Sequence, residues 1–401
     1  MTQDSFDLAI IGGGLGGATL ATVMARAGHR VVVLEKERQF RDRVRGEGMH
    51  AWGVPEAKRL GIYDRLLENC AMEVPYWDIR LGHTPFALRD FPASTPHASP
   101  LVSMPHARMQ ETLLALAAEA GAEVRRGAAV RELEPGPHPR LSVEQDGWMR
   151  EITARMVVAA DGRNSPTRKW AGFDVEHDPD ERLFTGVLLA GVPQPEDTWL
   201  GVLNAANGYE VALCNVGQGL VRAYLGHPRD AGLKLAKAQD LPTFVAASVE
   251  AGAPAHLYED ARVVGPMASF ASADAWVAKP YRDGVALLGD AAANCDPSFG
   301  QGMAMTLLGV RLLSEYLDVC DDWEVAGQAY ARDQHQAFTT VRTLENWYRE
   351  LFLAQGPAAD ARRARALPLI AADPSRVPDL FGMGPAAACD ESTRRRFFGD
   401  D

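Results

Sequence analysis

The chain has 401 residues, of which 47% are hydrophobic and 23% are charged, an ordinary balance for a globular protein with a substantial core. The formal net charge of −12 argues against nucleic acid and anionic membrane surfaces as partners, and five scattered cysteines without a CxxC pair predict neither a disulfide framework nor a bound metal. Because the first residues are acidic and no long apolar run occurs, we expect no signal peptide and no membrane span, and therefore a cytoplasmic protein whose partners are small molecules.

The first predicted unit is a strand, a glycine-rich turn, a helix and a second strand. Residues 8–11 and 31–34 form short apolar runs typical of buried strands. The turn after the first run matches the pattern GxGxxG, with Gly12, Gly14 and Gly17 as its glycines and Leu15 and Gly16 inside it. Glycines let the backbone approach a pyrophosphate at the positive end of a helix. Glu35 and Lys36 follow the second strand, where an acid can accept from a ribose hydroxyl, so the unit predicts a dinucleotide site.

The next segments alternate between loops, helices and strands. Residues 38–48 are basic and contain glycine, which predicts a loop beside the dinucleotide; Arg38, Arg41 and Arg43 either select a 2′-phosphate or form a solvated basic surface. We expect helices at 57–70 and 109–121, a loop at 92–100, and strands at 80–91, 122–130, 141–145 and 152–160. Val130 ends one of these strands at the expected cofactor. The last strand leads into Asp161 and Gly162, a second pairing of glycine with an acid.

Residues 183–225 change from helical to alternating periodicity, which predicts an antiparallel sheet inserted between segments of the first domain. Turns are expected at 206–208 and 217–219. Arg222 and Tyr224 share one face of the strand at 219–226, and Tyr209 and Glu210 lie on a neighbouring strand. If that face covers the cofactor, Arg222 could pair with an anionic group of a substrate and Tyr224 could hydrogen-bond a phenol; a solvated strand face is the alternative.

A third motif follows a predicted helix at 241–251 and a strand at 261–270. The apolar strand at 285–288 ends at Gly289 and Asp290, where an acid can bind a polyol chain. Pro297 and Gly300 precede a helix that begins at Gly302 and Met303, whose free backbone NH groups suit a developing negative charge. A second long helix is expected at 323–353, and the last 45 or so residues predict an irregular or helical cap. The three motifs in this order predict one bound FAD.

These motifs resemble the single-component FAD-dependent aromatic hydroxylases, whose archetype is p-hydroxybenzoate hydroxylase, over roughly residues 5–335. The resemblance implies that the first motif binds the ADP half of FAD, that Asp161 and Gly162 serve both FAD and the nicotinamide cofactor, and that Gly289 and Asp290 bind the ribityl and pyrophosphate region. Arg45 and Gly46 stand where the family contacts FAD, although Gly46-Glu47 is more similar to the halogenase and prenyl-reductase branches.

The chain departs from the family at the helix near the flavin. Where many relatives have arginine, this chain has His106 in the pattern His106-x-x-Met109-x-x-x-Leu113. Arg108 or Gln110 could replace the missing arginine, and we assign Arg108 to the cofactor site.

The resemblance implies an α/β fold, α+β overall, with a Rossmann-like FAD domain (1–80, 101–180 and 276–355), an inserted antiparallel-sheet domain that binds substrate (81–100 and 181–275) and a C-terminal cap (356–401). It also implies that NADPH or NADH reduces non-covalently bound FAD and leaves, that O2 forms a flavin C4a-hydroperoxide, and that an aromatic or polyene substrate is hydroxylated or epoxidised. The alternatives are a reductase or oxidase of the prenyl-reductase type, and a flavin-binding scaffold without turnover. A monomer and a homodimer are both open.

The candidates for catalysis are Arg222, Tyr224, His50 and Pro297. His50 and His227 could carry protons near the ring, although an ordinary surface or core histidine is the simpler interpretation. We interpret Cys295 as a small packing residue rather than a covalent tether for flavin.

Overall fold

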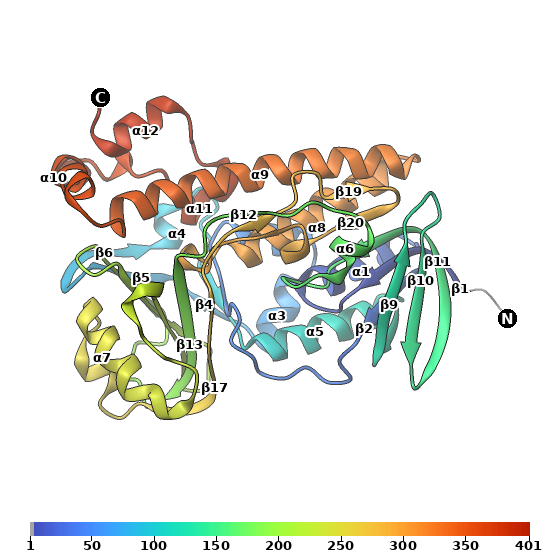
Figure 1. Cartoon of the computed structure of the whole chain (residues 1–401), viewed down its shortest axis with the longest axis horizontal. Helices are drawn as coiled ribbons and strands as arrows, with labels where there is room; N and C mark the ends of the chain where they lie inside the picture. Colours follow the sequence, from blue (N-terminus) through green and yellow to red (C-terminus); the bar gives the residue numbers. More distant parts are fainter. Residues whose placement is uncertain (1–3) are drawn as a thin grey trace.

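The first sheet of the structure, a computed structural model that describes residues 4–401, collects strands from distant parts of the chain (Figure 1). Its parallel centre has the order β20-β11-β1-β2-β8, and β19 pairs antiparallel with β20 at one edge. The strands are β1 (Asp4–Ile11), β2 (Val31–Glu35), β8 (Glu123–Arg126), β11 (Trp148–Ala159), β19 (Tyr281–Arg282) and β20 (Val285–Leu287). The three glycine–acid motifs follow β1, β11 and β20, which are neighbours in this order, so their carboxyl ends meet at one edge.

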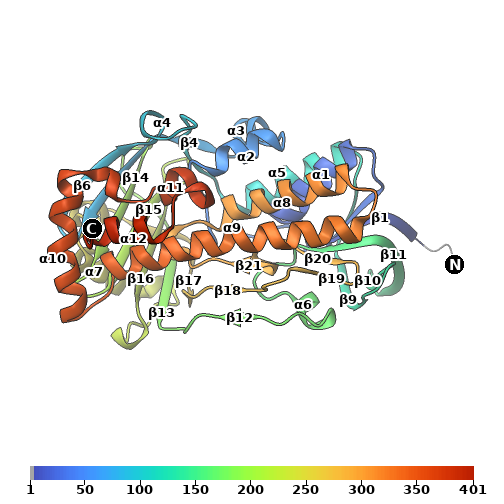
Figure 2. The same ribbon diagram turned by 90° about the horizontal axis from the view of Figure 1, so that it is seen from above.

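Each face of this sheet is covered by a different layer because side chains alternate along a strand. Leu8 and Ile10 pack against helices, whereas Ala9 and Ile11 pack against an antiparallel meander. The helices that contribute to the first layer are α1 (Leu15–Arg26), α5 (His106–Glu119), α8 (Gly302–Val319) and α9 (Trp323–Phe352); the meander is β9 (Ala128–Glu134), β10 (Arg140–Gln145) and the outer part of β11. Figure 2 shows α9 running along much of the length of the molecule.

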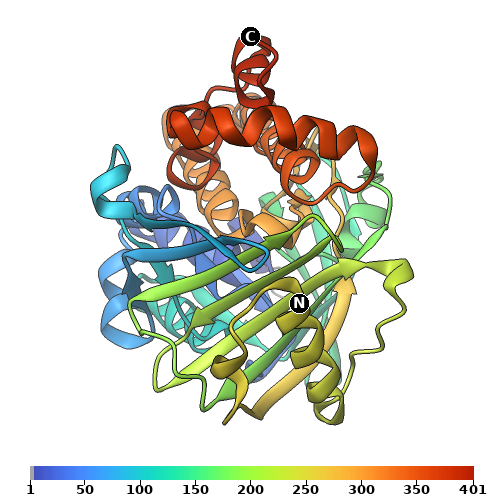
Figure 3. The same cartoon turned by 90° about the vertical axis from the view of Figure 1, so that its left-hand side faces the viewer.

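The second sheet has the order β17-β13-β16-β15-β14-β5-β6. Its strands are β5 (Tyr76–Leu81), β6 (Thr84–Asp90), β13 (Arg182–Ala190), β14 (Thr198–Asn204), β15 (Tyr209–Asn215), β16 (Leu220–Pro228) and β17 (Arg262–Ala271). Helix α7 (Leu241–Ala251) covers its outer face, packing on Val221, Ala223 and Leu225 of β16 (Figure 3). The intervening residues Arg222 and Tyr224 therefore point to the opposite face, towards the first sheet. The mixed α/β fold with an inserted sheet, largely antiparallel, confirms the expected fold class.

Several expected elements are divided in the structure. The helix expected at 57–70 is two helices, α2 (Gly53–Arg59) and α3 (Tyr63–Asn69), since Gly61 adopts a φ of +67° between them. The strand expected at 80–91 is the β5–β6 hairpin, with Gly82 at φ +56°, and the strand expected at 122–130 is split into β8 and β9 at Gly127, with φ +66°. A left-handed glycine ends or turns the element at each point. The first residues of the loop expected at 92–100 belong to a short helix, α4 (Phe91–Ser94).

Because of this hairpin, residues 76–80 belong to the second sheet and not to the first. Strand β5 pairs with β14 in the second sheet, parallel to it, whereas the expected boundary at residue 81 placed these residues with the first sheet. Two small sheets lie between the large ones: β3 (Gly48–Met49), β7 (Leu101–Ser103) and β4 (Met72–Val74), and β12 (Glu176–His177), β18 (Ala275–Trp276) and β21 (Ala293–Asn294).

The C-terminal cap is largely helical. It contains α10 (Pro357–Ala372), α11 (Leu380–Met383) and α12 (Glu391–Phe398), which lie over α9 and the end of the second sheet (Figures 1 and 3). Its buried Phe397 and Phe398 belong to the main core, so this segment is part of the folded body. Within residues 4–401, every helix is too short or too polar to traverse a lipid bilayer.

Candidate functional site

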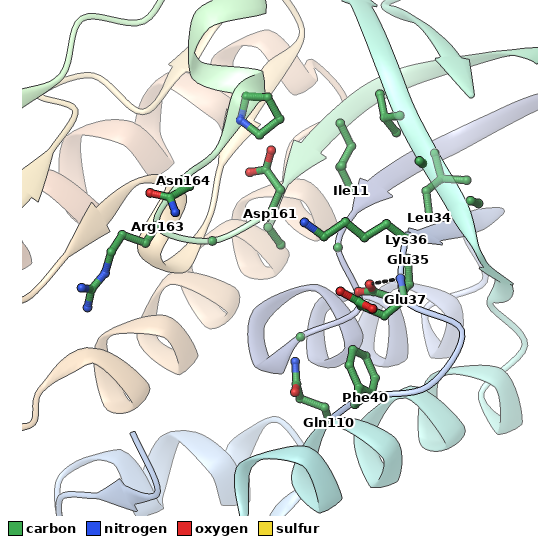
Figure 4. Close-up of a pocket in the computed structure, with 18 of the residues that line it drawn as sticks. Ile11, Leu34, Glu35, Lys36, Glu37, Phe40, Gln110, Asp161, Arg163 and Asn164 are labelled. Carbon is green, nitrogen blue, oxygen red and sulfur yellow. Dashed lines mark hydrogen bonds between the residues drawn. The ribbon is translucent and has the colours of Figure 1, made fainter. Parts of the chain in front are cut away.

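A cavity of about 540 Å³ opens where the first glycine turn, the end of β2 and the segment after β11 meet (Figure 4). Figure 4 shows Gln110 of α5 on one side of it and Asp161 on the other, with the side chain of Lys36 between them. The residues expected to bind cofactor that line this cavity are Gly12, Gly14, Glu35, Lys36, Arg45, Val130, Asp161 and Gly162. Those that lie outside its lining are Leu15, Gly16, Gly17, Gly46, Arg108, Gly289, Asp290, Pro297, Gly300, Gly302 and Met303.

The three positions of the first motif require glycine for different structural reasons. Gly12 adopts a φ of +100°, and a Cβ there would lie 2.5 Å from the carbonyl oxygen of Ala160. A Cβ on Gly17 would lie 2.0 Å from the carbonyl oxygen of Gly12, so this glycine permits the contact between α1 and β1. At Gly14 the nearest protein atom to a Cβ is the Gln110 amide nitrogen, 3.7 Å away. The fold therefore needs Gly12 and Gly17, whereas Gly14 leaves open space for a ligand.

Glu35 organises the rim of the cavity. One oxygen of its carboxylate accepts a hydrogen bond of 2.8 Å from the backbone NH of Gly13, and the other accepts one of 2.8 Å from the NH of Glu37. Each carboxylate oxygen can accept more than one hydrogen bond, so the group can still receive a ribose hydroxyl.

The second and third motifs adjoin the first. Asp161 accepts a hydrogen bond of 2.7 Å from the Thr167 hydroxyl, and Arg168 donates to the backbone carbonyls of Asp290 and Ala291. Thr306 of α8 lies between the first and the third motif. Its side chain would be 2.9 Å from a Cβ added to Gly16 and 3.1 Å from one added to Gly289. The three glycine–acid motifs are therefore neighbours in space.

The start of α8 lies beyond the cavity. A Cβ on Gly46, Gly162 or Gly302 would meet no protein atom within 4 Å, which leaves room for an elongated ligand from the cavity towards the helix N-terminus. Asp296, immediately before Pro297, accepts from Ser298 and Ser272 and pairs with Arg349 of α9, which lowers the pKa of Asp296 in spite of its burial. The residues present thus fit a dinucleotide carrying a large ring, as FAD does.

Arg222 and Tyr224 have protein partners on the inner face of the second sheet. The Arg222 guanidinium lies 2.7 Å from the carboxylate of Asp42 and 3.0 Å from that of Glu47, and only 2% of its side chain is exposed. The Tyr224 hydroxyl contacts the Glu47 carboxylate and the Arg45 carbonyl. The expected pairing of Arg222 with a substrate anion is therefore corrected: Glu47 and Asp42 already balance its charge, and the group ties the 38–48 loop to β16.

Glu47 is the centre of this network, although the sequence indicates only that Gly46-Glu47 is similar to the halogenase and prenyl-reductase branches. Burial raises its pKa to about 7, and the nearby Arg222 and Tyr224 oppose that rise. The sequence signal available was a single acid between two glycines, which does not distinguish a buried carboxyl from a surface one.

The helix α5 resolves the question raised by the missing arginine. Arg108 is exposed and donates to the carbonyl of Asn69 at 2.7 Å, so its assignment to the cofactor site is wrong in this structure. Gln110 and His106 line the cavity instead. His106 contacts the Gly46 carbonyl at 3.0 Å, and burial lowers its pKa to about 4.

His50, His227 and Cys295 are buried, whereas Pro297 is partly exposed. His50 is 3% exposed, its Nε2 lies 2.9 Å from the carbonyl oxygen of Phe299, and burial lowers its pKa to about 4. His227 is fully buried against the Pro228 carbonyl, as an ordinary core histidine would be. Cys295 is a buried thiol packed in the core, and burial raises its pKa.

Comparisons with known proteins agree with this geometry. A family described as the FAD binding domain matches residues 5–317. Rifampicin monooxygenase of Streptomyces venezuelae is 27% identical over 358 residues, which is 84% of this chain and 69% of that protein. Digeranylgeranylglycerophospholipid reductase 2 of Methanopyrus kandleri is 26% identical over 373 residues, 86% of this chain and 83% of that protein.

Among solved structures, p-nitrophenol 4-monooxygenase of Pseudomonas putida has the same fold, with a TM-score of 0.77 at 18% identity over 92% of this chain and 95% of that one. The family match spans all three motifs and the inserted sheet, and it confirms the resemblance drawn from the motifs and the prediction of FAD. The chain belongs to the FAD binding domain family and is an FAD-dependent monooxygenase.

Proposed function

We propose that this protein hydroxylates or epoxidises an aromatic or polyunsaturated small molecule with O2, and that NADPH or NADH visits it only to reduce the flavin. The observation that carries the proposal is the convergence of the three glycine–acid motifs on a path that runs from the cavity to the start of α8, beneath the inner face of the second sheet. The names of two relatives, rifampicin monooxygenase and p-nitrophenol 4-monooxygenase, support an aromatic substrate.

The residues at the cavity would bind the ADP half of FAD. Gly14 leaves room for the pyrophosphate at the N-terminus of α1, and Glu35 accepts from the ribose. Asp290 would bind the ribityl chain, and Gln110 replaces the arginine of other relatives. When bound, FAD supplies a ring that accepts a hydride from a nicotinamide and then activates oxygen.

The residues near the start of α8 would govern the reacting end. The backbone NH groups at Gly302 and Met303 would stabilise negative charge on the ring, and Pro297 would lie beside it. The Glu47–Arg222–Tyr224 group would hold Arg45 and Gly46 against the ring, and the second sheet would exclude water. Arg222 and Tyr224 thereby act as positioning residues.

The experiment is a screen of aromatic compounds for faster NADPH and NADH oxidation by the FAD-loaded protein, with mass spectrometry of the products. We expect at least one compound to accelerate flavin reduction and to gain one oxygen atom in air. Comparison of the two nucleotides tests whether Arg41 and Arg43, which line the cavity, select a 2′-phosphate. Arg43 also pairs with Glu37, and Arg38 pairs with Asp146. Acceleration by no aromatic or polyene compound would contradict the proposal.

A second candidate is a reductase of prenyl groups, which the reductase of Methanopyrus kandleri and the Gly46-Glu47 pair favour. A reductase would convert its substrate without oxygen, so turnover under anaerobic conditions separates it from the monooxygenase. A protein that binds FAD without stimulated turnover would be a scaffold.

We also propose that the protein works in the cytoplasm as a monomer or homodimer. Its five cysteines are all free thiols in the structure, which is the usual state in a reducing compartment.

A further inference from the structure

The loop of residues 296–301 joins β21 to α8 and directly precedes the helix N-terminus that faces the proposed flavin ring. We call it the 296–301 loop. It contains one short helical turn, Pro297–Phe299. The side chain of Gln301 holds its far end, because it donates to the Phe299 carbonyl at 2.7 Å and accepts from the Trp52 indole at 2.8 Å. What holds the near end is a buried ion pair.

Asp296 begins the loop and is its anchor. Only 1% of its side chain is exposed, and its carboxylate lies 2.5 Å from the guanidinium of Arg349 in α9. Burial would raise the pKa of Asp296, but Arg349 and the surrounding donors lower it, so the acid is ionised. The carboxylate also accepts from the backbone NH of Ser298 at 2.9 Å and from the Ser272 hydroxyl. The NH of Asp296 itself donates to Asp274 at 2.6 Å.

A second carboxylate holds the loop from the side of the second sheet. Glu210 of β15 is buried, pairs with Arg182 at 2.8 Å and accepts from the Ser298 hydroxyl at 2.8 Å. That hydroxyl lies equally close to Asp296 but has one hydrogen, which Glu210 can take because the NH of Ser298 already serves Asp296. A Cβ on Gly226 would lie 2.1 Å from the Glu210 carboxylate, so the glycine leaves room for this contact.

Arg349 reaches the loop from a part of the chain outside the family match, which ends at residue 317. Arg342 and Arg349 are seven residues apart on α9 and therefore lie on the same side of the helix. Arg342 pairs with Asp178 at 3.1 Å, whereas Arg349 pairs with Asp296. The 296–301 loop is thus clamped between the second sheet and α9.

The charge of Asp296 acts on the cofactor cavity. Burial lowers the pKa of Arg163, which lines the cavity, and the carboxylates of Asp290 and Asp296 oppose that fall. An unpaired carboxylate at this place would disfavour negative charge on a reduced flavin ring. Its pairing with Arg349 brings the net charge of the two groups to zero.

We propose that Arg349 is a positioning residue for the reacting end of FAD. Through Asp296 it fixes the 296–301 loop in place, with Glu210 as the anchor on the opposite side, and it offsets the negative charge of Asp296 near the ring. This inference rests on the proposed function, which places the flavin ring beside Pro297 and the start of α8.

The test compares four variants with the wild-type protein at pH 8, where a carboxylate that has lost its arginine stays ionised, since its ordinary pKa is about 4. Arg349→Gln removes the cation, Asp296→Asn removes the anion, and Arg349→Lys keeps the positive charge. Arg311→Gln is the matched control, because Arg311 of α8 has a similarly exposed side chain, 20% against 26%, and pairs with Glu56 of α2.

The first measurement is the midpoint potential of the bound flavin, by anaerobic dithionite titration without substrate. We expect Arg349→Gln to lower the potential and Asp296→Asn to raise it, because these variants leave opposite net charges near the ring. Arg349→Lys and Arg311→Gln should stay close to wild type. A merely structural role would move Arg349→Gln and Asp296→Asn in the same direction, towards the potential of free FAD, and that result would overturn the inference.

The second measurement is hydrogen exchange of the backbone NH groups of residues 296–302 in the FAD-free protein, by mass spectrometry. We expect exchange to be about tenfold faster in Arg349→Gln and Asp296→Asn, the value of one or two hydrogen bonds. Ser298→Ala removes only the hydroxyl that Glu210 holds, so it should speed exchange about fivefold and leave the flavin potential unchanged. Exchange as slow as in wild type in Arg349→Gln, or equally fast exchange in Arg311→Gln, contradicts the clamp.

Circular dichroism and FAD content show whether each variant is folded, and if Arg349→Gln does not fold, the rise expected for Asp296→Asn decides the question. The proposed function has a separate outcome, because neither measurement needs a substrate. Opposite potential shifts without oxygen transfer to any aromatic or polyene compound reject the proposed function, whereas oxygen transfer with unshifted potentials rejects this inference alone.

Discussion

Neighbouring glycines in the first motif are required for different reasons, although they look alike in the sequence. Gly17 allows α1 to approach β1, because a Cβ would lie 2.0 Å from a backbone oxygen that cannot move away. Gly14 has no such constraint in the protein itself. The two positions therefore separate the needs of the fold from the needs of the ligand.

We expect Gly14→Ala to leave the free energy of unfolding of the FAD-free protein within about 0.5 kcal/mol of wild type, and to weaken FAD binding at least tenfold through a clash with the pyrophosphate. Gly17→Ala serves as the control and is expected to destabilise the FAD-free protein by roughly 2 kcal/mol or more. Urea unfolding and flavin titration measure the two effects. Full FAD occupancy in Gly14→Ala would place the pyrophosphate elsewhere.

At the scale of elements, the 38–48 loop is joined to β16 by a buried group of charges. Glu47 faces Arg222 and Tyr224 of β16 and Asp42 of its own loop, and Cys214 of β15 lies near enough to sense its charge. A loop that is expected to contact FAD is thus held by strands of the second sheet. The link explains how two domains could keep one geometry around the flavin ring.

This link predicts a pH dependence of stability. The pKa of Glu47 rises from 4.5 to about 7 on folding, so its contribution to stability is fully present below pH 4.5 and is lost as the pH rises through about 7. The unfolding free energy of the wild-type protein should therefore fall between pH 5 and pH 8, and Glu47 should account for up to about 3 kcal/mol of that fall, since one pKa unit corresponds to about 1.4 kcal/mol. We expect Glu47→Gln to lack this part of the fall. Urea unfolding at both pH values measures it; an equal fall in the two proteins would contradict the assigned pKa.

At the scale of the whole molecule, FAD would connect segments that the chain separates by more than 270 residues, from Gly12 to Asp290. A ligand that binds only the folded state stabilises it, by about 2.7 kcal/mol at a concentration of one hundred times its dissociation constant. The ADP half would carry much of this binding, because the cavity lies at the first motif.

We therefore expect removal of FAD to lower the melting temperature by several degrees, and added FAD to restore it. FMN, which lacks the AMP half, should restore much less. Differential scanning calorimetry with each nucleotide makes the comparison. Equal stabilisation by FMN and FAD would show that the cavity does not receive the adenosine.

Local periodicity and glycine placement were sufficient to predict the βαβ unit, the three motifs and the inserted sheet, because each depends on residues close together in the chain. Bound FAD was predicted from the order of the three distant motifs and from the family that they resemble. Gly61, Gly82 and Gly127 were less informative, since a glycine inside an apolar pattern does not by itself show that the element ends there. The sequence left a helical and an irregular cap both open, because Pro368 lies inside α10 and the alanine-rich sequence of this helix has a weak pattern.

Contacts between distant side chains were decided only by the tertiary structure. Whether Arg222 meets a substrate or Glu47, and whether Arg108 or Gln110 faces the cavity, depend on strands, loops and helices that pack together from far apart in the sequence. Periodicity assigns a side chain to a face of its element, whereas packing determines what lies opposite that face.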